Sequence, residues 1–131
     1  MSISEVISKG QLSLGNIVLE YQLIGANRAA TAQRLAEALC RLGTERALVV
    51  CGNDELDEVS LWGQTDAWLV TGGEVRHLVW QVADLGLTPC HVSSIQVQSA
   101  AESADRLRAI FLGETGAARE IVLANAGAAL L

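Results

Sequence analysis

Lysine is nearly absent from this sequence of 131 residues, in which Lys9 is the only one. The arginines are scattered, and the formal net charge is −6. Because nucleic-acid binding depends on clustered Lys and Arg that neutralise phosphates, this balance argues against a nucleic-acid partner. An acidic protein can still bind a phosphorylated small molecule, provided that a divalent cation lies between the two negative partners.

Long hydrophobic runs are missing as well. No stretch approaches the roughly 18 to 20 consecutive apolar residues that cross a bilayer, and Asn125 interrupts the longest apolar-rich segment, residues 121–131. The first residues have neither a basic start nor an apolar block, so we predict no secretion signal. Cys40, Cys51 and Cys90 are an odd number without metal-ligand spacing, which suits a reducing compartment. We therefore expect a cytoplasmic protein that does not enter a membrane.

What the sequence has in abundance is hydrophobic residues, which make up 50% of the chain, while charged residues make up 18%. Charged residues normally approach a quarter of a soluble protein. This composition fits either a well-packed α/β domain or a piece that buries one face against a partner. The length fits one domain. We assign residues 1–15 to a poorly defined N-terminal segment and residues 16–131 to a single α/β domain.

The first half of this domain predicts a strand, a helix and a second strand. Residues 16–24 alternate and are rich in branched side chains, which is typical of a strand. Asn27 is a candidate N-cap for a helix that runs to about Leu42. The apolar run at residues 46–52 is typical of a strand covered on both faces. Together these segments indicate a βαβ unit with a parallel strand pair.

The second half predicts an antiparallel extension. Short strands are expected at residues 59–62, 67–71 and 74–82, and Gly72-Gly73 between the last two is a hairpin signal. The predicted fold class is therefore α/β: a partial doubly wound sheet, built from a βαβ unit with an antiparallel hairpin extension, with helices packed on the sheet.

Two further helices are expected near the C-terminus. Ser99 and Glu102 match a capping box that opens a helix to about Leu112. Its inward stripe would consist of Ala100, Ala104, Leu107 and Phe111. Residues 117–130 predict another helix with almost no polar face, so we expect it to be buried nearly all round.

Three spaced segments carry a recognisable pattern. The first is Leu42-Gly-Thr-Glu-Arg-Ala-Leu-Val-Val-Cys-Gly52, followed by Leu56-Asp57-Glu58 and Gly63-Gln64-Thr65. The second is Gly73-Glu-Val75 with Asp84-Leu-Gly-Leu87, and the third is Leu112-Gly-Glu-Thr-Gly116 with Arg119-Glu-Ile-Val-Leu123 and Asn125-Ala126. In order and spacing, from about Gln22 to Leu131, the combination resembles the anthranilate phosphoribosyltransferases.

The resemblance implies an ancestry in phosphoribosyl transfer, from phosphoribosyl pyrophosphate to the amino group of anthranilate, a Mg²⁺-dependent step of tryptophan biosynthesis. It also implies that Asp57 and Glu58 match the paired acids that hold Mg²⁺ in that family. The chemistry agrees, because one or two carboxylates usually hold Mg²⁺ while substrate oxygens and waters complete its octahedron. Acids that follow a parallel strand also lie where open α/β sheets bind ligands.

Other parts of the family pattern are not found in this sequence. It contains no Gly-Thr-Gly-Gly-Asp phosphate loop, no Lys-x-Gly-Asn segment and none of the family's anthranilate-contacting His and Arg residues. The segment Thr71-Gly-Gly-Glu74 falls at the family's hairpin, so it does not replace the phosphate loop. Cys51 stands where the family has His, and Glu55 where it has Gly. We predict a metal pair but no catalytic or other cofactor-binding residue, and interpret the chain as a fragment or truncated relative that is inactive alone.

Two alternatives of other classes stay open. One is a non-catalytic α/β module that binds a ligand or self-associates, and we expect a homo-oligomer because of the apolar composition and unpaired sheet edges. The other is a small enzyme with Cys51 as nucleophile. Since neither His77 nor His91 is evidently paired with Cys51, a buried structural cysteine is the favoured interpretation.

Three local features have a plainer explanation beside the functional one. Asp57 and Glu58 could simply belong to a solvated acidic loop with Asp54 and Glu55. The turn Gly25-Ala-Asn-Arg28 could present helix N–H groups to a phosphate, although a single glycine before a helix is usually just a turn. Asn125 is expected to satisfy a neighbouring backbone group rather than bind a ligand.

Overall fold

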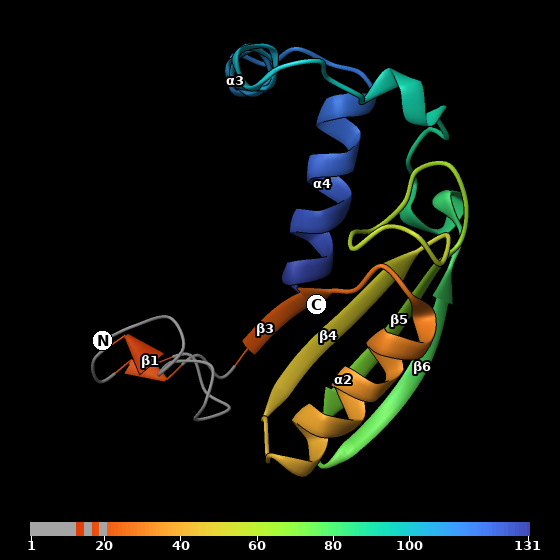
Figure 1. Cartoon of the computed structure of the whole chain (residues 1–131), viewed down its shortest axis with the longest axis vertical. Helices are drawn as coiled ribbons and strands as arrows, with labels where there is room; N and C mark the ends of the chain where they lie inside the picture. The colour runs from red at the N-terminus through yellow and green to blue at the C-terminus, as the bar shows by residue number, and fades with distance from the viewer. Residues whose placement is uncertain (1–12, 15–16, 19–20) are drawn as a thin grey trace.

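A four-stranded sheet forms the centre of the computed structural model, which describes residues 13–14, 17–18 and 21–131. Its strands lie in the order β3 (Tyr21–Gly25), β4 (Arg46–Gly52), β5 (Thr65–Thr71) and β6 (Glu74–Trp80) (Figure 1). β3 and β4 are parallel, whereas β4, β5 and β6 pair antiparallel. The predicted α/β class, with its βαβ unit and antiparallel extension, is confirmed.

Before this sheet, β1 (Ser13–Leu14) and β2 (Ile17–Val18) form a separate antiparallel pair. The strand predicted at residues 16–24 therefore corresponds to β2 and β3, and residues 16 and 19–20 lie outside the described residues. Most of the segment assigned to residues 1–15 also lies outside them.

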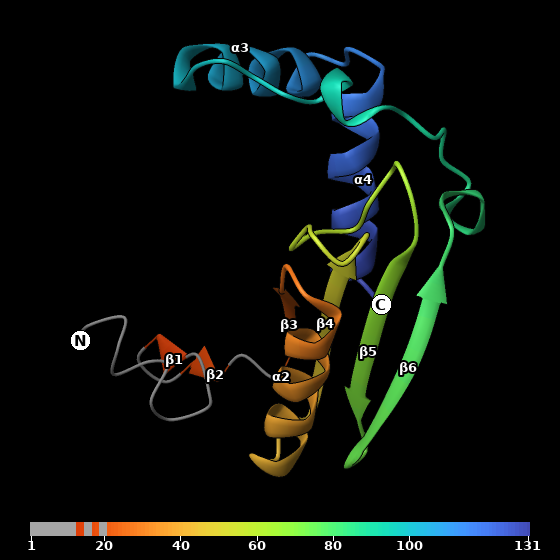
Figure 2. The same ribbon diagram turned by 45° about the vertical axis from the view of Figure 1, so that its right-hand side comes forward.

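Helices cover both faces of the sheet. Helix α2 (Ala29–Arg41) packs on one face, and α4 (Ala117–Ala129) contributes Ala124 and Ala128 to the core on the other (Figure 2). Side chains of β4 alternate between the two cores: Val49 packs with the α2 core and Val50 with the α4 core. Residues 47–52 are all buried, which confirms the prediction of a strand covered on both faces.

The hairpin between β5 and β6 turns at Gly72 and Gly73, as predicted. Their φ angles are +60° and +78°, the left-handed values that a two-residue type I′ turn requires. After Trp80 the chain leaves the sheet in a 3₁₀ turn, η1 (Val82–Leu85), so the strand predicted at residues 74–82 ends earlier than expected. A second 3₁₀ turn, η2 (Val92–Ser94), follows.

The strand predicted at residues 59–62 is wrong: these residues form a loop in which residues 59–61 are buried and Trp62 is half-buried. The Val59 N–H donates to Asn125 Oδ1 at 2.9 Å, and the Ser60 N–H donates to Thr65 Oγ1 at 2.9 Å. Side chains thus satisfy the backbone groups that a neighbouring strand would otherwise pair. The apolar sequence of these residues correctly predicted that they are buried, but it wrongly predicted that they form a strand.

Helix α2 starts one residue later than Asn27 predicts. Its N-cap is Arg28, whose side chain makes no capping bond. Instead, Asp54 from the loop after β4 accepts a hydrogen bond from the Ala29 N–H at 2.7 Å. The cap comes from a residue distant in sequence, so a local capping rule could not find it.

Helix α3 (Ala100–Phe111) lies away from the sheet and contacts α4 (Figure 2). Ser99 Oγ accepts a hydrogen bond from the Glu102 N–H at 3.1 Å, but the Glu102 carboxylate accepts from Gln98 rather than from Ser99. The expected inward stripe is wrong, since Leu107 is 48% exposed and Phe111 86% exposed.

The prediction that the C-terminal helix is buried nearly all round is also wrong. Only Ala124 and Ala128 of α4 are buried, whereas Val122 and Leu123 are more than two-fifths exposed. The contact with β3 and the sheet core covers one side of this helix only. Among the described residues, no helix is long and apolar enough to cross a membrane.

Candidate metal site at the acidic loop

The acidic loop, residues 53–58, begins where β4 ends, and it reverses direction immediately. Asn53 and Asp54 both have φ of +54°, a left-handed conformation that Asn and Asp tolerate better than other non-glycine residues. The Gly52 N–H then donates to the Leu56 carbonyl at 2.8 Å. The turn thus brings the following residues back to the end of the strand, and Glu55 itself does not have a positive φ.

Asp57 and Glu58 lie at the carboxyl ends of the two parallel strands. Gly25 ends β3 so close to Asp57 that a Cβ atom there would overlap the Asp57 carbonyl group. A Cβ atom at Gly52, the last residue of β4, would lie 2.7 Å from the Glu58 carbonyl oxygen. The position expected for ligand binding in an open α/β sheet is therefore the position that these two acids occupy.

Both acids line a pocket of about 490 Å³ between the end of the parallel pair and α4. Its other lining residues are mostly apolar: Leu23, Gly25, Val50, Ile121, Val122, Asn125 and Ala126. The carboxylates are exposed, so each can exchange water for a ligand. Within the described part of the chain, no group of three or more His, Cys, Asp or Glu residues gathers around a metal position. Two carboxylates fit Mg²⁺ when a substrate and waters supply the remaining oxygens.

Asn125 reaches the same pocket from α4 and bonds to backbone groups, as the sequence predicts. Its Oδ1 accepts from the Val59 N–H, and its Nδ2 donates to the Ile121 carbonyl at 2.9 Å. Asp54, by contrast, caps α2. Its carboxylate occupies the helix N-terminus, which favours the simple turn over a phosphate site at Gly25-Ala-Asn-Arg28.

Cys51 has the features of a structural cysteine. It is fully buried, and this burial raises the pKa of its thiol, with the nearby charges of Asp54 and Asp66 raising it further. His77 pairs with Asp66 at 2.8 Å and stacks on Trp68, and the His91 ring bonds to Ser93. A thiol held protonated is a poor nucleophile, so the geometry disfavours an enzyme built on Cys51.

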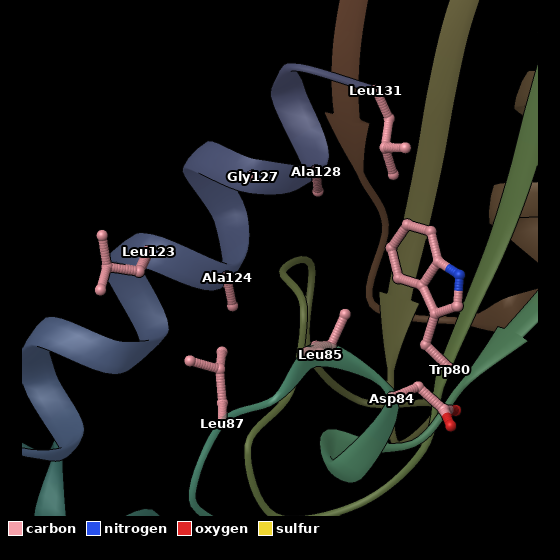
Figure 3. A pocket seen from close by; sticks show the side chains of 9 residues that line it. All are labelled: Trp80, Asp84, Leu85, Leu87, Leu123, Ala124, Gly127, Ala128 and Leu131. Atoms are coloured by element: carbon pink, nitrogen blue, oxygen red, sulfur yellow. The ribbon is translucent and has the colours of Figure 1, made fainter.

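A second pocket, of about 540 Å³, lies between α4 and the turn after β6 (Figure 3). Leu123, Ala124 and Ala128 of α4 face Leu85, Leu87 and Trp80 across it. Its only acid, Asp84, accepts a hydrogen bond from the Gln81 N–H at 2.8 Å. Because this pocket gathers no set of polar groups, it is a less suitable place for chemistry than the acidic loop.

Comparison with known proteins decides the family. Residues 14–131 match the α/β domain of the glycosyl transferase family. The chain belongs to this family.

Among the most similar relatives of this glycosyl transferase family domain are anthranilate phosphoribosyltransferases. That of Desulfitobacterium hafniense (strain Y51) is 40% identical over 110 residues, and that of Shouchella clausii is 43% identical over 111 residues. Each alignment covers 84% of this chain and 33% of the relative. The chain is thus a partial relative that spans about a third of the length of the proteins it matches.

Solved structures agree with this domain in fold. The anthranilate phosphoribosyltransferase of Saccharomyces cerevisiae in complex with 4-fluoroanthranilate matches with a TM-score of 0.72 and 21% identity, over 82% of this chain and 32% of that one. The same yeast enzyme in complex with PRPP and Mg matches with a TM-score of 0.69 and 23% identity. At these identities the likeness concerns the fold alone.

Proposed function

We propose that this chain carries the divalent-cation part of a phosphoribosyl-transfer site. Asp57 and Glu58 would hold Mg²⁺ for the pyrophosphate of phosphoribosyl pyrophosphate. The main support is their place, in one pocket at the carboxyl ends of β3 and β4. The relatives are anthranilate phosphoribosyltransferases, one of them solved with PRPP and Mg, which names the substrate class.

The residues of the chain would bind and orient rather than react. When bound, Mg²⁺ would stabilise the negative charge that develops on the departing pyrophosphate. The two carboxylates would hold the cation at the rim of the sheet, and the apolar side chains of Leu23, Val50 and Ile121 would limit water on one side of the pocket. No side chain of this site is assigned to proton transfer.

We further propose that the 131-residue chain does not transfer phosphoribosyl groups alone. Phosphoribosyl transfer depends mainly on holding the donor in position and on stabilising charge. The sequence supplies two acids but neither the phosphate loop nor the anthranilate-contacting residues of the family. Phosphoribosyl pyrophosphate bound only through its cation would remain free to rotate in the pocket.

Two readouts test this proposal. Mn²⁺, titrated as a paramagnetic substitute for Mg²⁺, should bind the chain more tightly when phosphoribosyl pyrophosphate is present. Anthranilate fluorescence should stay constant over hours in a mixture of chain, phosphoribosyl pyrophosphate and Mg²⁺. No Mn²⁺ binding under either condition would overturn the cation role, and fluorescence decay at an enzyme-like rate would overturn the inactivity.

Self-association is a second candidate role, and the exposed apolar side chains favour it. Tyr21 on the edge strand β3 is 60% exposed, and Phe111, Leu112 and Leu130 are all more than 85% exposed. Burying these side chains between copies would remove apolar surface from water. Sedimentation equilibrium should give a multiple of 13.9 kDa, and a monomer across the accessible concentration range would exclude this role.

A further inference from the structure

We propose that Asn125 is a positioning residue that fixes the loop carrying Asp57 and Glu58, so that cation affinity depends on helix α4. This inference rests on the proposed function of the acidic pair. It adds a third element to the site: β3 and β4 place the pair at the sheet edge, and α4 holds the loop there.

The contact is made at the residue that follows the acids. Val59 comes directly after Glu58 and is fully buried, and its N–H donates to Asn125 Oδ1 at 2.9 Å. The Asn125 Nδ2 donates to the Ile121 carbonyl at 2.9 Å, one turn earlier in α4, and approaches the Val59 carbonyl at 3.5 Å. The amide is therefore anchored to its own helix while it bonds to the loop, which fixes its orientation.

On the other side of the loop, hydrogen bonds hold the residues that flank the pair, since the Leu56 carbonyl accepts from the Gly52 N–H and the Ser60 N–H donates to Thr65 Oγ1. Gly25 abuts the Asp57 carbonyl, and Gly52 abuts the Glu58 carbonyl. Among the described residues, Asn125 is the side chain that bonds within residues 57–59 themselves. Its bond to Val59 ties the loop to α4 directly beside the acidic pair.

Replacement of Asn125 by Ala would leave the buried Val59 N–H without its acceptor. The loop could then regain a hydrogen bond only by moving toward water, which would spread the two carboxylates over many positions. Outer residues that orient metal ligands typically change metal affinity by about 10- to 100-fold when they are removed. We expect Asn125→Ala to weaken Mn²⁺ binding by about tenfold, measured with phosphoribosyl pyrophosphate present.

Glu120→Ala is a matched control on the same helix. Glu120 Oε2 accepts from the Thr88 N–H at 2.9 Å, so it also joins α4 to a loop, but to one that does not carry the acids. Glu120→Ala should leave the Mn²⁺ affinity and the electron paramagnetic resonance line shape of bound Mn²⁺ unchanged. Asn125→Ala should change both. Equal effects of the two substitutions, or no effect of Asn125→Ala, would overturn the positioning role.

Asn125→Gln covers the case in which the alanine variant does not fold. It keeps an amide oxygen for the Val59 N–H and an amide N–H for the Ile121 carbonyl, and it adds no charge to the pocket, so we expect its Mn²⁺ affinity to stay close to that of the unsubstituted chain. A folded Asn125→Gln chain with clearly weaker binding would contradict the inference. Absence of Mn²⁺ binding by the unsubstituted chain would instead overturn the proposed function and this inference together, whereas binding that is indifferent to residue 125 would overturn the inference alone.

Discussion

Substitution of Asp57 by Asn and of Glu58 by Gln in one chain is expected to abolish specific Mn²⁺ binding. Both side chains are exposed and line the same pocket, so the exchange removes both carboxylates from the pocket without disturbing the core. Neutral amides are much weaker ligands for a hard cation than carboxylates. The Mn²⁺ affinity should fall by about 100-fold or more. Residues that only orient metal ligands change metal affinity by up to about 100-fold when they are removed, and the loss of the carboxylates themselves should be at least as large.

Glu55→Gln separates this site from a merely acidic surface. Glu55 lies in the same loop and is exposed, and its Oε1 accepts from Trp62 Nε1 at 3.3 Å, a bond that glutamine can keep. A specific site at Asp57 and Glu58 predicts nearly unchanged Mn²⁺ affinity for Glu55→Gln in a titration at physiological ionic strength. If the loss of the Glu55 charge weakened Mn²⁺ binding as much as the loss of the charge at Asp57 or Glu58, the loop would be a solvated acidic segment without a metal role.

Leu61→Ala is expected to cause the largest loss of stability. Leu61 is fully buried in the core that joins the sheet to α4, and its carbonyl accepts from the Cys90 N–H at 2.9 Å. Removal of a buried leucine side chain typically costs about 2–5 kcal/mol of unfolding free energy. Urea denaturation should give a loss of roughly 3 kcal/mol within that range.

Leu123→Ala is the control for this stability measurement. Leu123 is 44% exposed on α4, so the same chemical change should cost less than about 1 kcal/mol. A similar loss for both variants, or a loss below about 1 kcal/mol for Leu61→Ala, would show that residues 59–62 are not packed as the structure has them.

Local sequence signals determined the central elements well. The buried run at residues 46–52 gave β4, and Gly72-Gly73 gave the β5–β6 turn, because each feature depends on side chains within a few residues. The βαβ unit followed from their order along the chain. These elements place the end of the parallel pair, and with it the candidate site.

The features that depend on distant contacts were the ones predicted wrongly. Nothing near Ala29 in sequence shows that Asp54 caps α2, since the two residues are 25 positions apart. The apolar sequence of α4 indicates that the helix packs against other parts of the protein, but it does not show which of its sides are buried. The sequence also gives no sign that residues 59–62 would bond to Asn125 and Thr65 rather than to another strand.

The candidate site was only partly accessible from the sequence. The resemblance singled out Asp57 and Glu58, and the predicted strand placed them at its carboxyl end. The Asn125 amide was expected to satisfy backbone groups, but its partner Val59 lies 66 residues away, so its link to the acidic loop emerged only from the fold. The Asp66–His77 pair likewise depends on the register between β5 and β6, which no local pattern specifies.

The most direct measurement is an anomalous difference map from crystals of the chain grown with Mn²⁺ and phosphoribosyl pyrophosphate. The account predicts a peak within coordination distance, about 2.1 Å, of carboxylate oxygens of Asp57 and Glu58, beside Gly25 at the end of β3. A peak bound only to other acids, or a fully ordered acidic loop that holds no metal under these conditions, would contradict it.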